Sequence, residues 1–258
     1  MMKRLAVINT LSVILVLFVN FLASTGKINN LSVSELSNEY ENLFTPAGYA
    51  FSIWGIIFLG LIVYSVFQLK SVFIDEIEIK LFSQIGYWLS FANLGNALWL
   101  IAWLYEYTLA SVCIMLFILF SLLMIVVKTN IKNTNISLKI NAFVRWPMSL
   151  YAGWITVATI ANVAAFLSKI NWDGGPFTES TWTIVMIIVA TILNLIMIWR
   201  QNIRVFAFVG IWAIIAIYVR HKFTFESIAF AAISSAAVLL INVLIHAYRY
   251  RHTRSFMN

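Results

Sequence analysis

Long apolar stretches separated by short polar connections make up almost the whole chain. Each stretch is close to the about 20 residues that a helix needs to cross the hydrocarbon core of a bilayer. The pattern predicts spans at residues 5–24, 46–69, 82–104, 108–128, 146–168, 181–199, 203–219 and 227–248. The seventh span is the shortest and gives the weakest signal.

The continuity of these stretches sets the fold class. Within lipid every backbone N–H and C=O group needs a partner inside the protein, so a span is either a helix or a strand of a closed barrel. Barrel strands are shorter and alternate apolar with polar positions, whereas these stretches are apolar throughout. The sequence therefore predicts an all-α fold, a polytopic membrane helix bundle of about eight transmembrane helices.

The first stretch has a second interpretation. It is preceded by Met1-Met2-Lys3-Arg4 and followed by Ala23-Ser24-Thr25-Gly26, which is the arrangement of a cleaved signal peptide. Its apolar part is longer than the apolar region of a typical signal peptide. We therefore favour a helix that is retained in the protein.

Composition leaves no room for a sizeable soluble domain. Hydrophobic residues occupy 62% of the 258 positions and charged residues 10%, and the mean hydropathy is +0.91. So few charges cannot cover the surface of a soluble domain, and the lipid bilayer is the expected partner. The net charge of +7 does not indicate a nucleic acid partner, because the basic residues flank apolar stretches instead of forming one patch.

The basic residues also predict the orientation, because cytoplasmic loops carry an excess of Lys and Arg. If the N-terminus lies inside, 13 of the 17 basic residues fall on the cytoplasmic side. These are Lys3, Arg4, Lys70, Lys80, Lys128, Lys132, Lys139, Arg145, Arg200, Arg204, Arg249, Arg251 and Arg254. The sequence predicts a multi-pass protein of the cytoplasmic (inner) membrane with both termini cytoplasmic. Omitting the seventh span would place the basic C-terminal tail outside.

The interiors of the predicted spans lack charged groups. No Asp, Glu, Lys or Arg lies in the central part of any span. Such residues mark proton relays and ion pathways, so no ion-coupled transport and no catalytic residue is predicted. No Cys/His cluster has metal-ligand spacing, so no metal site is predicted. The single cysteine, Cys113, is interpreted as a buried packing residue.

Aromatic and amide side chains share one face in three of the spans. They are Phe51, Trp54 and Phe58 in the second, Asn96, Trp99 and Trp103 in the third, and Trp154, Ala158 and Asn162 in the fifth. Aromatic faces stack on planar ligands, and an amide can fix their orientation. Ordinary helix packing explains the same stripes and is favoured by periodicity alone. Six further tryptophans are interpreted as interfacial: Trp88, Trp146, Trp172, Trp182, Trp199 and Trp212.

Three motifs in the same spans resemble the TspO/MBR family, the translocator proteins or tryptophan-rich sensory proteins. They are Thr45-Pro46-Ala47-Gly48-Tyr49-Ala50-Phe51-Ser52-Ile53-Trp54-Gly55, the pair Asn96 and Trp99, and Tyr151-Ala152-Gly153-Trp154-Ile155-Thr156-Val157-Ala158-Thr159-Ile160-Ala161-Asn162. Only one proline of the family's Pro-Pro pair is present, and Val157 replaces a phenylalanine. The resemblance covers residues 1–170 and is to longer relatives with additional C-terminal helices.

The resemblance implies a five-helix bundle over residues 1–170, followed by three further helices over residues 171–258. It also implies a cavity that binds a porphyrin, a haem-like tetrapyrrole or a sterol, covered by a lid formed by residues 25–45. No cofactor follows from the residues themselves, and a tetrapyrrole ligand follows only from the resemblance. The implied ligand-binding residues are Pro46, Tyr49, Phe51, Trp54, Asn96, Trp99, Trp103, Tyr151, Trp154, Ala158 and Asn162.

Three functions are compatible with this pattern. The first is a ligand-binding or sensory membrane protein of TspO type. The second is a facilitative transporter or channel for a neutral solute, which the lack of buried charge permits. The third is an enzyme that degrades its bound pigment, for which no residue supplies acid–base chemistry. A run of mostly small residues at 231–237 also permits close contact with another helix, including one from a second copy in a homodimer.

Overall fold

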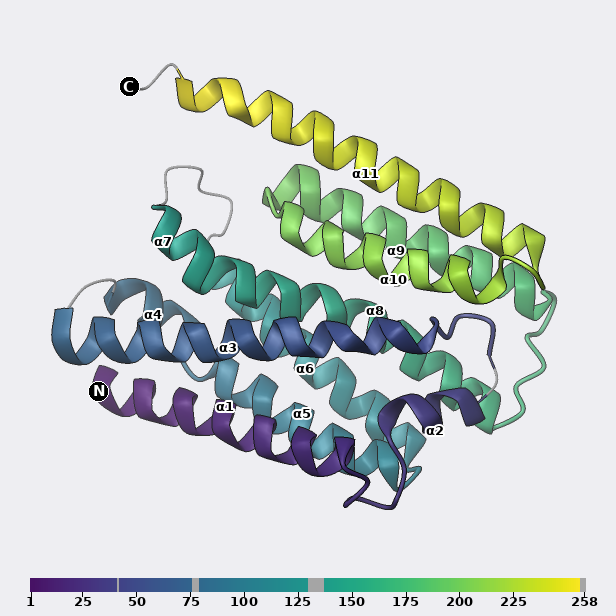
Figure 1. Ribbon diagram of the computed structural model, residues 1–258, viewed down its shortest axis with the longest axis horizontal. Helices are drawn as coiled ribbons and strands as arrows, with labels where there is room; N and C mark the ends of the chain where they lie inside the picture. The colour runs from purple at the N-terminus through teal and green to yellow at the C-terminus, as the bar shows by residue number, and fades with distance from the viewer. Residues whose placement is uncertain (41, 76–78, 130–136, 256–258) are drawn as a thin grey trace.

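The computed structural model describes residues 1–40, 42–75, 79–129 and 137–255, and every regular element among them is helical (Figure 1). The elements are α1 (Met2–Ser24), α2 (Val33–Glu39), η1 (Gly48–Ser52), α3 (Ile53–Lys70), η2 (Ser71–Asp75), α4 (Ile79–Ile85), α5 (Trp88–Leu104), α6 (Thr108–Lys128), α7 (Leu138–Ile140), η3 (Asn141–Arg145), α8 (Trp146–Lys169), α9 (Glu179–Gln201), α10 (Arg204–His221) and α11 (Glu226–Ser255). The all-α fold is confirmed.

Eight of these helices correspond in order to the eight predicted spans. Within the described residues, seven helices are long and apolar enough to cross a membrane, and α5 is a shorter apolar helix of 17 residues. At 1.5 Å per residue α5 is about 26 Å long, close to the thickness of a bilayer core. The chain is a multi-pass integral membrane protein.

The first five long helices form a closed ring. Helix α1 packs on α3 and α5, α5 packs on α6, α6 packs on α8, and α8 returns to α3. Ile57, Leu61 and Tyr64 of α3 and Tyr151 and Ile155 of α8 are completely buried in the resulting core. In this ring α3 and α8, which carry two of the aromatic stripes, are neighbours, whereas α5, which carries the third, packs on α1 and α6.

The last three long helices pack on one another and are joined to the ring mainly through α10, which lies against α8 and η1. Gly153 makes this contact close: a Cβ atom at that position would lie 3.1 Å from the carbonyl oxygen of Phe206 on α10. The predicted division near residue 170 falls in the connection between α8 and α9, and it stays a prediction. In α11, Ala232 and Ala236 of the small-residue run are buried within this chain, and the homodimer also stays a prediction.

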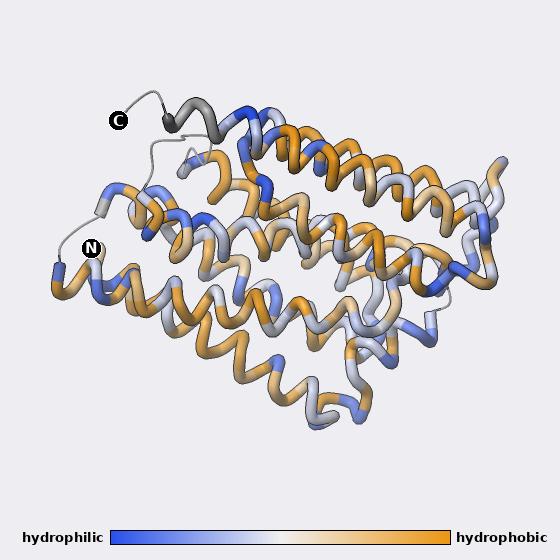
Figure 2. The backbone as a smooth tube through the Cα atoms, turned by 45° about the horizontal axis from the view of Figure 1, so that its top comes forward, coloured by the Kyte–Doolittle hydropathy of each residue, from blue (hydrophilic) through white to orange (hydrophobic). Residues whose placement is uncertain are grey.

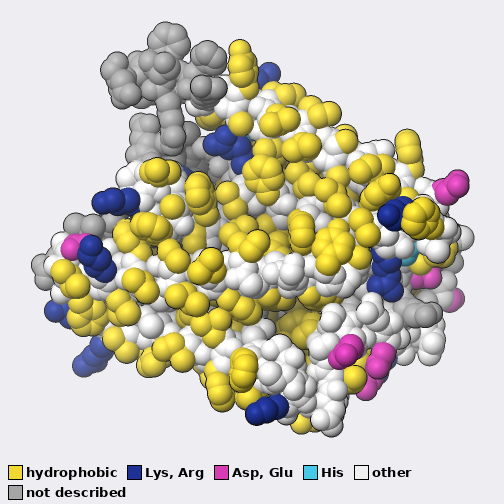
Figure 3. All heavy atoms as spheres, viewed as in Figure 1, with side chains coloured by type: hydrophobic (Ala, Val, Ile, Leu, Met, Phe, Trp, Pro, Cys, Tyr) yellow, Lys and Arg dark blue, Asp and Glu magenta, His cyan; other side chains and the backbone are white. Residues whose placement is uncertain are grey.

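Polar residues gather at the two ends of the bundle and apolar residues between them (Figure 2). Apolar side chains cover much of the surface seen in Figure 3, as expected for helices that face lipid. Both chain termini lie at the same end (Figure 1), where Lys and Arg side chains also gather (Figure 3). Lys132, used in the charge distribution, lies outside the described residues, as do the side chains of Arg251 and Arg254.

Two expectations from the sequence were wrong: the continuity of the third span and the burial of Cys113. The third span is not continuous, because the chain turns at Gly86, whose φ is +55°, between α4 and α5. Glycine adopts this left-handed conformation without steric cost. Cys113 is exposed on the outer surface of α6 and is not a buried packing residue. In a membrane an apolar residue is equally stable facing lipid, so hydropathy did not define its side of the helix.

Candidate functional site

The three aromatic stripes converge on one cavity of about 40 Å³ near the end of the bundle opposite the termini. It lies between α3, α5 and α8 and is covered by α2. Its lining consists of Val33, Ser37, Pro46, Phe51, Trp54, Trp99, Trp103, Trp154, Val157, Ala158, Ala161 and Asn162. The structure therefore brings eight of the eleven implied ligand-binding residues together. Val33, Ser37, Val157 and Ala161 were not singled out from the sequence.

Indole and phenyl rings form the walls of this cavity. Trp99 and Trp103, one helical turn apart on α5, have nearly parallel rings 6.1 Å apart with an interplanar angle of 17°. Across the cavity Trp154 meets Trp54 and Phe51 edge to face, at 6.3 and 5.9 Å. Flat aromatic surfaces at different angles around one void are suited to a planar apolar group.

Both polar atoms of the Asn162 amide form hydrogen bonds inside the protein. Its Oδ1 accepts a hydrogen bond from Nε1 of Trp99, at 3.4 Å, and its Nδ2 donates to Oγ of Ser111, at 3.0 Å. The Ser111 hydroxyl in turn donates to the carbonyl oxygen of Thr108, at 2.7 Å. Asn162 therefore fixes the ring of Trp99. Ser111 was missed in the sequence because it lies on α6, outside all three stripes.

The indole N–H of Trp154 has a different environment. Trp154 is only 2% exposed, and its Nε1 has no hydrogen-bond partner among the described residues. Leaving a buried donor unsatisfied costs about 1–3 kcal/mol. Because Trp154 also lines the cavity, this donor is a buried polar group there that a ligand could satisfy.

Two of the implied binding residues lie outside the cavity and join helices instead. Asn96 donates to the hydroxyl of Tyr151, at 3.1 Å, and that hydroxyl donates to the carbonyl oxygen of Ala92, at 3.3 Å. Asn20 of α1 donates to the Asn96 side chain, at 3.3 Å. This network ties α1, α5 and α8 together, further along α5 towards the end that carries the termini.

Tyr49 also lies outside the cavity. It is 41% exposed on η1, and its ring meets that of Trp212 on α10 edge to face, at 5.1 Å. The Trp212 indole donates from Nε1 to the carbonyl oxygen of Ala50, at 3.1 Å. Trp212, interpreted from the sequence as interfacial, therefore connects η1 to the added C-terminal helices.

The predicted lid, residues 25–45, contains α2 and covers the cavity. Its helix begins with a capping box in which Ser32 and Glu35 each bond to the other's backbone. A hydrogen bond from Nε1 of Trp103 to the carbonyl oxygen of Val33, at 3.4 Å, holds the start of α2 against the cavity wall. Val33 also lines the cavity, so the lid is closed.

A polar cluster fixes the end of α2. Tyr40 donates a hydrogen bond to Oε2 of Glu106, at 2.6 Å, and Lys169 forms an ion pair with the same oxygen, at 3.5 Å. The hydrogen bond from Tyr40 and the charge of Lys169 hold the pKa of Glu106 below its usual value. Burial, reinforced by Glu106, raises the pKa of Tyr40. At neutral pH this cluster stabilises the closed lid.

The C-terminal helices hold the rest of the lid. Arg220 of α10 donates to Oδ1 of Asn38, at 3.0 Å. Leu43 is held at both backbone groups, since its N–H donates to Glu179 at 2.8 Å and its carbonyl oxygen contacts Nε2 of His221 at 2.9 Å. The sequence did not reveal these contacts, because their partners are more than 100 positions apart.

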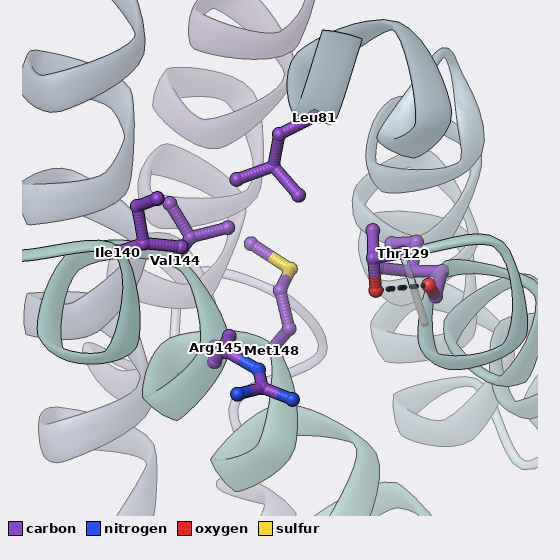
Figure 4. Close-up of a pocket in the computed structure, with 7 residues that line it drawn as sticks. Leu81, Thr129, Ile140, Val144, Arg145 and Met148 are labelled. Carbon is purple, nitrogen blue, oxygen red and sulfur yellow. Dashed lines mark hydrogen bonds between the residues drawn. The ribbon is translucent and has the colours of Figure 1, made fainter. Parts of the chain in front are cut away.

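Metal-ligating side chains do not form a cluster among the described residues. Among them no group of three or more His, Cys, Asp or Glu side chains could hold a metal ion. A small pocket near the termini has a volume of only about 10 Å³. Figure 4 shows Met148 extending towards Leu81 there, while the guanidinium group of Arg145 points away from Leu81. A void of this size holds at most about one water molecule.

Comparison with known proteins gives one match. A family model described as TSPO-like protein matches residues 6–245. The matched range includes the three C-terminal helices as well as the five-helix ring. No curated protein and no solved structure matches the chain.

Proposed function

The chain belongs to the TSPO-like family, and from this premise we propose that it binds a planar, mostly apolar ligand in the cavity between α3, α5 and α8. The observation that carries the proposal is the buried, unpartnered indole N–H of Trp154 in a cavity walled by aromatic rings. An acceptor atom on the edge of a planar ligand would satisfy this donor while its faces contact the rings.

A porphyrin or another tetrapyrrole fits this chemistry best. Its faces are flat and apolar, and its polar substituents lie at the edge. The lining carries no charged side chain, so the binding energy comes from stacking and from burial of apolar surface. A sterol is the second ligand class, because it offers an apolar body with one hydroxyl oxygen.

The closed cavity is too small for either ligand. Its volume of about 40 Å³ compares with about 300–1,000 Å³ for typical ligand pockets. Ligand entry therefore requires α2 to move away from Trp103. A protein that binds only in an open state loses apparent affinity in proportion to the rarity of that state. The lid contacts with α9 and α10 link ligand binding to the C-terminal helices, which is the arrangement of a sensor.

A channel or facilitative transporter is less well supported. The Asn20–Asn96–Tyr151 network lies between the cavity and the end of the bundle that carries the termini. Deeper still, Asn9 bonds to Ser90 and Gln68 between α1, α3 and α5. These buried networks fill the centre of the ring, so a path along its axis would require breaking them.

The basic end of the bundle is proposed to face the cytoplasm, with the cavity near the opposite membrane surface. The excess of Lys and Arg around both termini supports this orientation. A cysteine introduced at Lys222 in a Cys113→Ser background should react with an impermeant maleimide added to whole cells. A cysteine at Lys3 should not. The reverse labelling pattern would invert the orientation.

Ligand binding is tested by titrating the purified protein with protoporphyrin and following the absorbance of the porphyrin. Trp154→Phe keeps an aromatic ring but removes the donor together with part of the indole surface, and should weaken binding at least about tenfold, the effect of losing a buried hydrogen bond. Trp199→Phe, outside the cavity, is the matched control and should leave affinity unchanged. Saturable binding that is unaltered in a Trp99→Phe, Trp154→Phe double variant would rule out this cavity.

A further inference from the structure

A second and much larger hollow lies between α8 and α9, with a volume of about 720 Å³. It is lined by Asn42, Leu43, Phe44, Thr159, Ile160, Val163, Ala164, Leu167, Ser168, Trp172, Asp173, Gly174, Glu179, Trp182, Thr183 and Met186. None of these residues lines the aromatic cavity. The two hollows lie on different faces of α8, and this second one is called the α8–α9 cleft.

The size and depth of the α8–α9 cleft suit one small amphiphile. Its volume falls within the about 300–1,000 Å³ typical of ligand sites. Its lining on α8 runs from Thr159 to Ser168, about 14 Å of helix and thus about half the thickness of a bilayer core. The connection between α8 and α9 lies at the end of the bundle opposite the termini (Figure 1). The cleft therefore opens within the half of the membrane at that end.

The cleft has an apolar body and a polar rim. Ile160, Val163 and Leu167 of α8 and Met186 of α9 form apolar parts of its lining. At the rim Trp182 donates from Nε1 to the carbonyl oxygen of Gly174, at 2.7 Å, which fixes the loop that closes the end of the cleft. An apolar chain can occupy the body while a polar head group remains at the membrane surface.

Two carboxylates define the charge of the rim. Glu179 accepts a hydrogen bond from the backbone of Leu43 at 2.8 Å, and Asp173 accepts one from the backbone of Gly175 at 3.0 Å. A carboxylate can accept about four hydrogen bonds, so each can still accept a donor from a bound head group. Both residues line the cleft.

The nearby basic side chains are directed elsewhere. Lys169 bonds to the carbonyl oxygen and carboxylate of Glu106, and Arg220 bonds to Asn38. His221 contacts the backbone of the lid. The lining itself contains no Lys, Arg or His. An anionic head group would therefore meet two carboxylates and no cation, which is unfavourable.

We propose that the α8–α9 cleft binds a single-chain amphiphile with a hydroxyl or amine head group, whose apolar chain lies between α8 and α9 and whose head donates hydrogen bonds to Asp173 and Glu179. Phospholipids of the surrounding bilayer are disfavoured because each carries a phosphate and two chains. This site is separate from the aromatic cavity, so failure of porphyrin binding would leave it unaffected.

The test uses the full-length protein in phosphatidylcholine nanodiscs. Dodecylamine, dodecanol and dodecyl phosphate, each with a bromine in mid-chain, are titrated while the quenching of tryptophan fluorescence is followed. The amine should show saturable quenching with an affinity about tenfold higher than the phosphate, because the two carboxylates attract one head group and repel the other. Equal or tighter binding of the phosphate would overturn the proposal.

Variants locate the site. Ala164→Phe fills the α8–α9 cleft and should abolish the saturable phase, whereas Ile188→Phe places the same side chain at an exposed position of α9 and should retain it. An Asp173→Asn, Glu179→Gln double variant keeps oxygen acceptors for the two backbone N–H groups. It should retain dodecanol binding while reducing the preference for the amine over the phosphate to about one, since the charge is gone. A saturable phase that survives in Ala164→Phe, or a preference unchanged in the double variant, would exclude this cleft.

Discussion

Trp99 on α5 donates its indole N–H to the side-chain oxygen of Asn162 on α8, at 3.4 Å, and both residues line the aromatic cavity. The neighbouring indole of Trp154 is equally buried and donates to nothing among the described residues. One tryptophan of the cavity therefore stabilises the fold, while the other carries a donor that the folded chain does not use. This difference gives the first prediction.

Trp99→Phe should destabilise the ligand-free protein by at least about 1 kcal/mol, because it removes the hydrogen bond that the indole donates to Oδ1 of Asn162. Trp154→Phe should destabilise the protein less than Trp99→Phe, because both variants lose the same ring volume but the donor of Trp154 has no partner among the described residues. Denaturant unfolding in detergent micelles measures both. A loss of stability in Trp154→Phe as large as that in Trp99→Phe would show that its N–H is satisfied in the protein.

Helix α10 contacts both the lid, at Asn38, and η1, at Ala50. These contacts should limit opening of the cavity. Arg220→Gln combined with Trp212→Phe removes the hydrogen bonds to Asn38 and to the Ala50 carbonyl oxygen. Hydrogen exchange of the amides in residues 38–40 and 42–50 should become about thirtyfold faster, since about 1 kcal/mol is lost for each of the two bonds. Lys222→Gln, a neighbouring position without a lid contact, is the control. Unchanged exchange in the double variant would mean that the lid is held elsewhere.

Acid should open the lid. The pKa of Glu106 is held below the ordinary 4.5, first by the hydrogen bond from Tyr40 and then by Lys169. A carboxylate with a lowered pKa in the closed state stabilises that state above its ordinary pKa, and this contribution is lost as the pH falls through the lowered value. Tryptophan fluorescence of Trp103 should therefore report opening below about pH 4, near the pKa of free carboxyl groups.

Two variants separate the groups that titrate in this range. Glu106→Gln can still accept from Tyr40 but does not titrate, so acid-induced opening should largely disappear. The pKa of Glu35 is lowered as well, by hydrogen bonds from the backbone and side chain of Ser32. Glu35→Gln tests its share by removing that titration at the start of α2. If acid opens both variants as it opens the unaltered protein, the Tyr40–Glu106–Lys169 cluster does not control the lid.

Gly153 should be required for the joint between the ring and the C-terminal helices. A Cβ atom there would lie 3.1 Å from both the Phe206 carbonyl oxygen and Cβ of Val209. Gly153→Val should destabilise the protein by about 1–3 kcal/mol through overpacking against α10. Gly55→Ala on α3 is the control, because nothing lies within 4 Å of its added Cβ atom, and it should stabilise by about 0.5–1 kcal/mol. Equal thermal stability of Gly153→Val and the unaltered protein would contradict the close α8–α10 contact.

Much of the fold was predictable because the membrane imposes a simple rule on sequence. A span needs a continuous apolar stretch, and the eight stretches correspond to eight helices. The stripes were equally informative, since residues four apart on a helix share a face. The break at Gly86 was not located in this way, because apolar residues predominate on both sides of it and the stretch was assigned to one span.

The hydrogen bonds that hold the lid were hidden for a different reason. Arg220 and Asn38 are 182 positions apart, and neither position belongs to a periodic pattern. Trp212 lies near the end of a predicted span, as an interfacial tryptophan would, although its indole donates to the carbonyl oxygen of Ala50. Tyr151 and Asn96 were expected to line the cavity, but their polar atoms satisfy each other. Which polar groups pair with each other depends on tertiary packing, and a single sequence does not specify it.

A density map of the protein with bound protoporphyrin tests the central claim most directly. Our account predicts density for the ring system between α3, α5 and α8, with α2 displaced and Nε1 of Trp154 within hydrogen-bonding distance of a ligand atom. Density in the α8–α9 cleft alone, with the aromatic cavity still closed, would contradict it.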